Sequence, residues 1–141
     1  MSIPLAVLDF NPAMGAGMIL NSDTMFTRLV VLVYNAIRDE FRRQVNKTMT
    51  MLRGFDTCYN GPILALTITF KFVGMNVMLS AENVMIHSSS GDISCLAMAA
   101  MPNNVNSMLN VITNMQQQNH MILFDVPSGR VGMACEPCTR A

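Results

Sequence analysis

The chain is 141 residues long, 51% of them are hydrophobic, and its nine basic and nine acidic residues give a net charge of zero. This is the length of one domain, which we expect to comprise residues 1–141. The balanced charge, with no basic stripe to neutralise phosphates, argues against nucleic-acid binding. The longest apolar stretch, around residues 29–33, is far shorter than the roughly 20 residues that cross a bilayer, which argues against a membrane span.

The first predicted strand is a short apolar segment near the N-terminus. Asn11-Pro12 and the following Gly15 and Gly17 indicate a turn, and residues 18–20 form an apolar triplet typical of a buried strand. Residues 1–4 lack the basic start of a signal peptide, so no export signal is predicted. The polar residues after the strand are expected to form a loop.

Residues 30–45 are predicted to form the one amphipathic helix, because apolar residues recur there at intervals of three and four. These residues are Val30, Val33, Tyr34, Ile37, Phe41 and Val45. Directly after the helix, Asn46-Lys47-Thr48 has the pattern of an N-glycosylation acceptor, which is used only in the secretory pathway. Without an export signal, we expect Asn46 to stay unmodified.

The rest of the chain is predicted to form short strands. Residues 64–72 alternate between apolar and polar side chains, and a turn at 73–76 leads into a strand at 77–79. Further strands are predicted at 84–87, 94–99, 121–126 and 131–134, with turn-forming residues between several of them. The sequence therefore predicts a mainly β domain with one packed helix.

Residues 17–24 resemble a catalytic loop. They read Gly-Met-Ile-Leu-Asn-Ser-Asp-Thr and are similar to the second Asp-Ser-Gly-Thr loop of pepsin-like aspartic proteases. Later segments resemble the C-terminal lobe of the plant branch of that family, the nepenthesin-like proteases and the related xylanase inhibitors. These segments are residues 24–29, 55–59, 95–98, 114–120, 123–126 and 130–132. The resemblance covers nearly the whole chain and implies the C-terminal lobe of the bilobal pepsin-like fold.

The resemblance places Asn21 at the position of the family's catalytic aspartate. These proteases hydrolyse peptides with two aspartates, one from each lobe, that share a proton and activate a water molecule. An amide cannot hold and release that proton, so Asn21 is expected to be catalytically silent. Ser22 and Thr24 match hydroxyl residues that brace the loop in the family, and they are expected to preserve its scaffold.

Asp23 is not expected to replace the missing carboxylate. Two residues along an extended chain displace a side chain by roughly 6 to 7 Å, whereas a catalytic group must lie within about 0.5 Å of its working position. Asp23 also stands where the family has glycine, which predicts local strain or an opened loop. Val111 and Ile112 would line the substrate cleft by analogy with the family's second loop, although a core position is the simpler interpretation.

Four cysteines, Cys58, Cys95, Cys135 and Cys138, allow three disulfide pairings, and the spacing alone does not choose among them. The family resemblance implies that Cys58 pairs with Cys95 and that Cys138 matches the last cysteine of the lobe. A four-thiolate zinc site is disfavoured by the spacing, and the two histidines lie apart from any cluster of metal ligands. No metal and no cofactor are therefore predicted.

The leading hypothesis is a truncated C-terminal lobe of an aspartic endopeptidase, inactive alone, that serves peptide binding or lobe pairing. Its expected partners are the missing N-terminal lobe or another lobe-like chain, and a peptide or protein ligand. A charged fraction of only 13% agrees with a surface that pairs with a partner. The alternatives are a non-catalytic binding protein of the xylanase-inhibitor type and a gene fragment without a stable function. Members of the family are typically secreted, whereas no signal peptide is predicted, so the location stays open.

Overall fold

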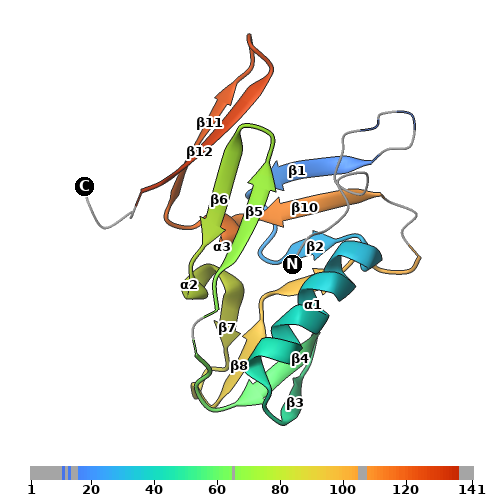
Figure 1. Cartoon of the computed structure of the whole chain (residues 1–141), viewed down its shortest axis with the longest axis vertical. Helices are drawn as coiled ribbons and strands as arrows, with labels where there is room; N and C mark the ends of the chain where they lie inside the picture. The colour runs from blue at the N-terminus through green and yellow to red at the C-terminus, as the bar shows by residue number, and fades with distance from the viewer. Residues whose placement is uncertain (1–10, 12, 14–15, 65, 105–107, 137–141) are drawn as a thin grey trace.

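The computed structural model describes residues 11, 13, 16–64, 66–104 and 108–136. Pro12 and Gly15 of the predicted turn, and Cys138, lie outside these residues. In chain order the elements are β1 (Gly17–Asn21), β2 (Thr27–Leu29), α1 (Val31–Val45), β3 (Met49–Leu52), β4 (Phe55–Asn60), β5 (Ile68–Phe72), β6 (Met75–Leu79), α2 (Ala81–Val84), β7 (Met85–His87), β8 (Ile93–Leu96), β9 (Met98–Ala100), β10 (Leu109–Thr113), α3 (Asn114–Gln117), β11 (His120–Asp125) and β12 (Arg130–Cys135). Strands predominate and α1 is the one long helix of the described chain, which confirms the predicted mainly β fold (Figure 1).

The described strands form two four-stranded sheets and two hairpins. The sheets have the orders β1-β10-β2-β9 and β3-β4-β8-β7, and the hairpins are β5-β6 and β11-β12. Strand β1 runs parallel to β10, with Gly17 opposite Leu109 and Asn21 opposite Thr113. Segments far apart in the sequence are thus hydrogen-bonded neighbours. The two hairpins project together at the upper end of Figure 1.

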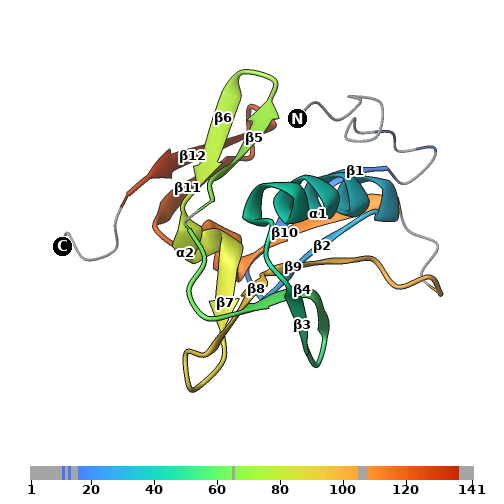
Figure 2. The ribbon, with the colours of Figure 1, turned by 60° about the horizontal axis from the view of Figure 1, so that its bottom comes forward.

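Helix α1 lies over the β1-β10-β2-β9 sheet and contacts β2 and β9 (Figure 2). Its buried residues are Val33, Tyr34, Ile37 and Phe41, all of them positions that the periodicity predicts to face inward. The helix begins one residue later than predicted because Val30 is extended, with φ −54° and ψ 145°. The Val30 N–H donates instead to Asn110 Oδ1, at 3.0 Å.

The β5-β6 hairpin shows the predicted alternation over a shorter length. In β5 the side chains of Thr69 and Lys71 are exposed, whereas Phe70 between them is buried. The strand begins at Ile68 and not at residue 64, and β6 begins at Met75, so that the predicted four-residue turn is reduced to residues 73–74. The alternation therefore identified the buried face correctly and overestimated the strand length.

The strand predicted at 94–99 is in fact two strands that belong to different sheets. Strand β8 pairs with β4 and β7, whereas β9 pairs with β2. Between them, the fully buried Ala97 donates its N–H to Val84 O at 2.8 Å, and there the chain passes from one sheet to the other. The strand predicted at 84–87 likewise starts later, at Met85, because Val84 ends the short helix α2.

Four strands were not predicted: β2, β3, β4 and β10. Strand β10 illustrates the reason, because Asn110, Ile112 and Thr113 are all buried there. A strand with buried polar side chains on both faces has no alternation of polar and apolar residues to detect. The core that these strands complete contains fully buried Leu29, Tyr59, Leu79, Leu96 and Met98.

Candidate functional site

The loop that resembles a catalytic loop leaves the carboxyl end of β1. Asn21 is the last residue of that strand, and its Oδ1 accepts a hydrogen bond from the Asp23 N–H at 2.8 Å. A side-chain oxygen that accepts from a backbone N–H two residues later forms an Asx turn. Asn21 is half-buried, whereas Ser22, Asp23 and Thr24 are exposed. The Asn21 carboxamide thus holds the turn closed.

The backbone at Asp23 is not in the left-handed region. In the described part of the chain, Asn46 and Asn119 are the two non-glycine residues with positive φ. The strain that the substitution of glycine predicts is therefore absent at Asp23, because this turn does not need the conformation that favours glycine.

The junction of β10 with α3, at Thr113 and Asn114, holds the Asn21 loop. The Asn114 N–H donates to Thr24 O at 2.9 Å, and the Asn114 side chain reaches Ser22 O at 3.4 Å. Thr113 Oγ1 donates to Met25 O at 2.8 Å. Within the described residues, the hydroxyls of Ser22 and Thr24 make no hydrogen bond. The backbone carbonyls of these residues, and not the predicted hydroxyls, anchor the loop in this lobe.

A buried polar cluster adjoins this junction and consists of Thr27, Thr113, Gln116 and Asn83, each at most 1% exposed. Gln116 Oε1 accepts from Thr27 Oγ1 at 2.6 Å and lies 3.3 Å from Thr113 Oγ1, whose proton is donated to Met25 O. Gln116 Nε2 donates to Asn83 O at 2.9 Å and to Ala97 O at 3.1 Å. Buried polar groups are costly unless they are paired, and here the carboxamide oxygen accepts a hydrogen bond while its nitrogen donates two.

No pattern in the sequence predicted this buried polar cluster. Gln116 falls in the segment 114–120 that carries the family resemblance, but nothing in its spacing identifies it as buried. Its partners Thr27 and Ala97 are 89 and 19 residues away in the chain. Only the tertiary fold brings them together.

The loop borders a surface depression lined by Ile19, Asn21, Thr24, Met25, Phe26, Arg28 and Val111. The structure therefore brings Asn21, Thr24 and Val111 together at one depression. Ile112 is 1% exposed and belongs to the hydrophobic core. Neighbouring residues of a strand point to opposite faces, so Val111 and Ile112 do not line the same surface.

The chemical inventory of the depression is limited. Arg28 is the one charged side chain among the described lining residues, and none of them is an acid. The Arg28 guanidinium donates to Ala100 O at 3.2 Å. Such a surface offers hydrogen-bonding and apolar contacts to a peptide, but no carboxylate that would activate a water molecule.

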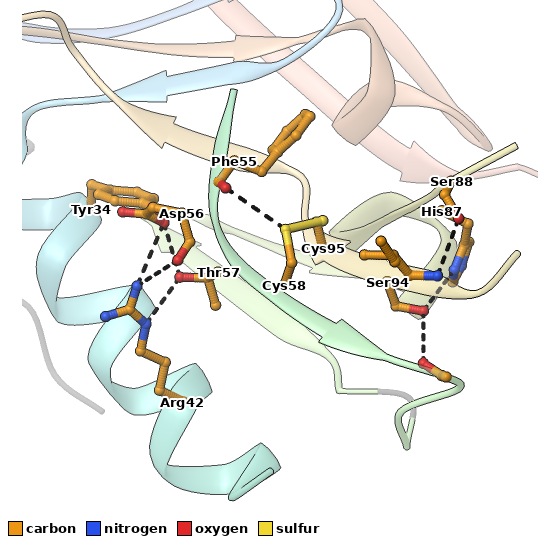
Figure 3. Close-up of a disulfide and its surroundings, with 12 residues drawn as sticks. Tyr34, Arg42, Phe55, Asp56, Thr57, Cys58, His87, Ser88, Ser94 and Cys95 are labelled. Atoms are coloured by element: carbon orange, nitrogen blue, oxygen red, sulfur yellow. Dashed lines mark hydrogen bonds and ion pairs between the residues drawn. A yellow bond between two sulfur atoms is a disulfide. The ribbon is translucent and has the colours of Figure 1, made fainter. Parts of the chain in front are cut away.

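The disulfide between Cys58 and Cys95 is present, as the family resemblance implies (Figure 3). Cys58 lies opposite Cys95 in the antiparallel pairing of β4 with β8, and both side chains are fully buried. Cys135 is exposed and is not bonded to either of the other described cysteines. Among the described residues, no cluster of three or more His, Cys, Asp or Glu side chains is arranged to hold a metal ion.

A polar cluster beside the disulfide joins α1 to β4 (Figure 3). The Tyr34 hydroxyl donates to the Asp56 carboxylate, and Arg42 Nε donates to Thr57 Oγ1 at 3.0 Å. Burial of Tyr34, together with this hydrogen bond, raises the pKa of the Tyr34 hydroxyl. The bonds join the helix to the strand that carries Cys58, so we interpret the cluster as structural.

The two histidines lie outside the depression. His87 Nδ1 is 2.9 Å from Ser94 Oγ, and Ser94 Oγ in turn donates to Gly61 O at 3.3 Å. His120 Nδ1 is 3.0 Å from Gln118 O. The pair of His87 and Ser94 does not resemble a catalytic base with its nucleophile, because the Ser94 hydroxyl is buried and already donates its proton to a backbone carbonyl. His120 Nδ1 contacts a backbone carbonyl, which is not a nucleophile.

Comparison with known proteins identifies the family. The xylanase inhibitor C-terminal family matches residues 1–135. Aspartyl protease AED3 of Arabidopsis thaliana is 48% identical over 134 residues, which cover 93% of this chain and 30% of that protein. Aspartic proteinase nepenthesin-1 of Nepenthes gracilis is 31% identical over 129 residues, which cover 86% of this chain and 28% of that protein.

The solved structures agree on the fold. The crystal structure of edgp superposes with a TM-score of 0.76 at 18% identity and covers 96% of this chain and 36% of that one. The chain belongs to the xylanase inhibitor C-terminal family and is a C-terminal lobe of the plant pepsin-like aspartic protease type. The predicted family and fold are thereby confirmed. The chain spans about 30% of the length of the curated relatives that it matches.

No helix in the described part of the chain is both long enough and apolar enough to cross a membrane.

Proposed function

We propose that this chain is a non-catalytic lobe of the aspartic protease family, which binds peptide or pairs with a second lobe and does not hydrolyse peptides by itself. The supporting observation is the loop geometry. Asn21 lies at the end of β1 and in the lining of the depression, which is where the family resemblance expects a carboxylate, and its Oδ1 is occupied by the Asp23 N–H.

The chemistry of the family explains why the exchange is decisive. Two carboxylates that share one proton must act as base and acid in turn, and one of them comes from each lobe. Asn21 cannot ionise near neutral or acidic pH. Asp23 is exposed in the turn, outside the lining of the depression, and does not reach the position of the side chain two residues earlier.

A second lobe is the proposed partner. The chain matches 30% of the length of Aspartyl protease AED3, and the dyad chemistry needs a carboxylate from another lobe. The half-buried Asn21 and the exposed Met25, at 63% exposure, would face such a partner. A peptide held between two lobes would then contact the depression beside Val111.

The test is to co-refold the full chain with the N-terminal lobe of an active relative. Wild type, Asn21→Asp, Asp23→Gly and the double variant are compared for cleavage of a fluorogenic peptide at acidic pH. We expect no cleavage by wild type or by Asp23→Gly, and cleavage only by variants that carry Asn21→Asp. Circular dichroism of each variant and gel filtration of each pair verify folding and pairing. Cleavage by the paired wild type above that of the N-terminal lobe alone would refute the proposal.

A binding protein of the inhibitor kind is the second candidate, and the description of the matched family favours it. The purified chain would then reduce the rate of xylan hydrolysis by a xylanase in proportion to its concentration. The protease-lobe proposal expects no effect. Inhibition that persists in Asn21→Asp would favour the inhibitor function, since that function does not depend on the dyad.

A further inference from the structure

The sequence contains a single Asn-x-Ser/Thr acceptor pattern, Asn46-Lys47-Thr48. N-glycosylation requires the asparagine amide as nucleophile, a hydroxyl residue two positions later, and any residue except proline between them. All three requirements are met here. The proposed protease-lobe function makes no use of this segment.

The backbone N–H of Asn46 is hydrogen-bonded within the fold, whereas its side chain is bonded to no described residue. Asn46 follows the last residue of α1 in a left-handed conformation, with φ 46° and ψ 44°, and its N–H donates to Arg42 O at 3.0 Å. This is the usual geometry of a helix C-terminus, and asparagine is one of the few residues that tolerate it. Asn46 is exposed, and its carboxamide makes no hydrogen bond within the described part of the chain.

The neighbouring groups leave the acceptor accessible. Thr48 is exposed, and its hydroxyl is likewise not engaged by any described residue. Lys47 Nζ donates to Pro62 O at 2.9 Å, so the lysine side chain is held by the segment before β5. A glycan attached at Asn46 would therefore break no hydrogen bond made by the described part of the lobe.

There is also room for a bulky group beyond Asn46. Strand β3 starts three residues later and is an edge strand, because it pairs with β4 alone in the order β3-β4-β8-β7. Met49 and Met51 on this edge are 48% and 84% exposed. In Figure 1 the end of α1 and β3 lie at the bottom of the molecule, well below β1 and β10, so a glycan there would not cover the candidate site.

The disulfide indicates the kind of cellular compartment in which the protein folds. Cys58 and Cys95 are bonded to each other and fully buried between paired strands, so the bond is part of the folded core. Structural disulfides form in oxidising compartments and are rare in the cytosol. In eukaryotes such a compartment is the secretory pathway, where N-glycans are transferred. The disulfide therefore reverses the sequence-based expectation that Asn46 stays unmodified, because it is evidence on the compartment that is independent of any export signal.

We propose that Asn46 is an N-glycosylation site. In the transfer, Asn46 Nδ2 forms a bond to the anomeric carbon of an oligosaccharide. The bond between that carbon and the pyrophosphate oxygen of a lipid-linked donor breaks, the lipid pyrophosphate leaves, and the amide gives up one proton to a base of the transferase. The modification requires no oxidant or reductant.

The experiment is to produce the full chain behind a secretory leader in eukaryotic cells and to measure its intact mass before and after treatment with a peptide N-glycosidase. Wild type is compared with Asn46→Gln, Thr48→Ala and Thr48→Ser. The exposed Asn104, which lies in no acceptor pattern, supplies the matched control Asn104→Gln. Cell lysate is measured as well as medium, because transfer to the nascent chain does not depend on final folding.

We expect wild type, Thr48→Ser and Asn104→Gln to carry one glycan that the glycosidase removes, leaving aspartate at position 46. Asn46→Gln and Thr48→Ala should have the unmodified mass. An unmodified wild type in which the Cys58–Cys95 bond has formed would overturn the proposal, as would a glycan that persists in Thr48→Ala. The same mass measurement on the polypeptide from its native tissue applies the test to the natural product, where an unmodified mass would equally refute it.

Discussion

The side chain of Gln116 is fully buried, and both the oxygen and the nitrogen of its carboxamide are hydrogen-bonded. Through its contacts with Thr27 and Thr113 it supports β2, which follows the Asn21 loop, and the end of β10. Through Asn83 O and Ala97 O it also joins α2 to the crossing between the two sheets. One side chain thus couples the candidate site to both sheets of the lobe.

Replacement of Gln116 by methionine, which has a similar shape, should be strongly destabilising. The change leaves two buried carbonyl oxygens without a donor, and the expected loss is about 2–4 kcal/mol in the free energy of unfolding. Urea unfolding followed by circular dichroism measures it. The exposed Gln118 is the matched control, and Gln118→Met should cost less than about 0.5 kcal/mol. Equal stability of the two variants would show that the buried cluster contributes little.

At the scale of elements, the Cys58–Cys95 bond joins two neighbouring strands of one sheet and closes a segment with a sequence separation of 37. That segment contains the β5-β6 hairpin, α2 and β7. A cross-link of this length restricts the unfolded chain more than the folded sheet, because β4 and β8 are already paired by backbone hydrogen bonds.

Removal of the disulfide by the double change Cys58→Ala and Cys95→Ala should therefore lower the free energy of unfolding. Loop-closure entropy for this separation predicts a loss of about 4 kcal/mol. The measurement is guanidinium unfolding under non-reducing conditions, with Cys135→Ser as the control, since Cys135 is exposed and bonded to no other described cysteine. A loss below about 1 kcal/mol would contradict a stabilising role.

Elements were predictable where one face of a segment is buried and the other is exposed. Helix α1 and strand β5 have such faces, so periodicity located both. Strands β8 and β9 do not. The residues around Ala97 are buried on all sides, and the change of sheet depends on the bond from Ala97 N–H to Val84 O, which no local pattern reveals.

At the scale of the whole molecule, the β11-β12 hairpin exposes more apolar surface than a free-standing lobe needs. Met121, Leu123, Phe124, Val126 and Val131 are between 45% and 82% exposed. The hairpin projects from the upper end of the molecule (Figure 1). Clustered apolar groups of this kind mark a surface that associates with another chain, or that aggregates when no partner is present.

The lone chain should therefore self-associate as its concentration rises, through this hairpin. Sedimentation velocity over a concentration series measures the association. The double change Leu123→Lys and Val126→Lys should keep the chain monomeric without altering its circular dichroism, whereas Met51→Lys, a control at an exposed apolar residue of β3, should associate as wild type does. The role of the hairpin would be contradicted if wild type stayed monomeric at every concentration, or if Met51→Lys reduced self-association as much as the double change does.

The amino-acid sequence by itself determined the family, the helix and the presence of asparagine at position 21, because these depend on residue identity and on short-range periodicity. The tertiary structure alone decided that Gln116 is buried, that Val111 and Ile112 face opposite ways, and that the loop is anchored through backbone carbonyls. The physical reason is distance along the chain. Hydrogen bonds between Thr27 and Gln116, or between Ser22 and Asn114, join residues about 90 positions apart, and only the packed sheets bring such partners together.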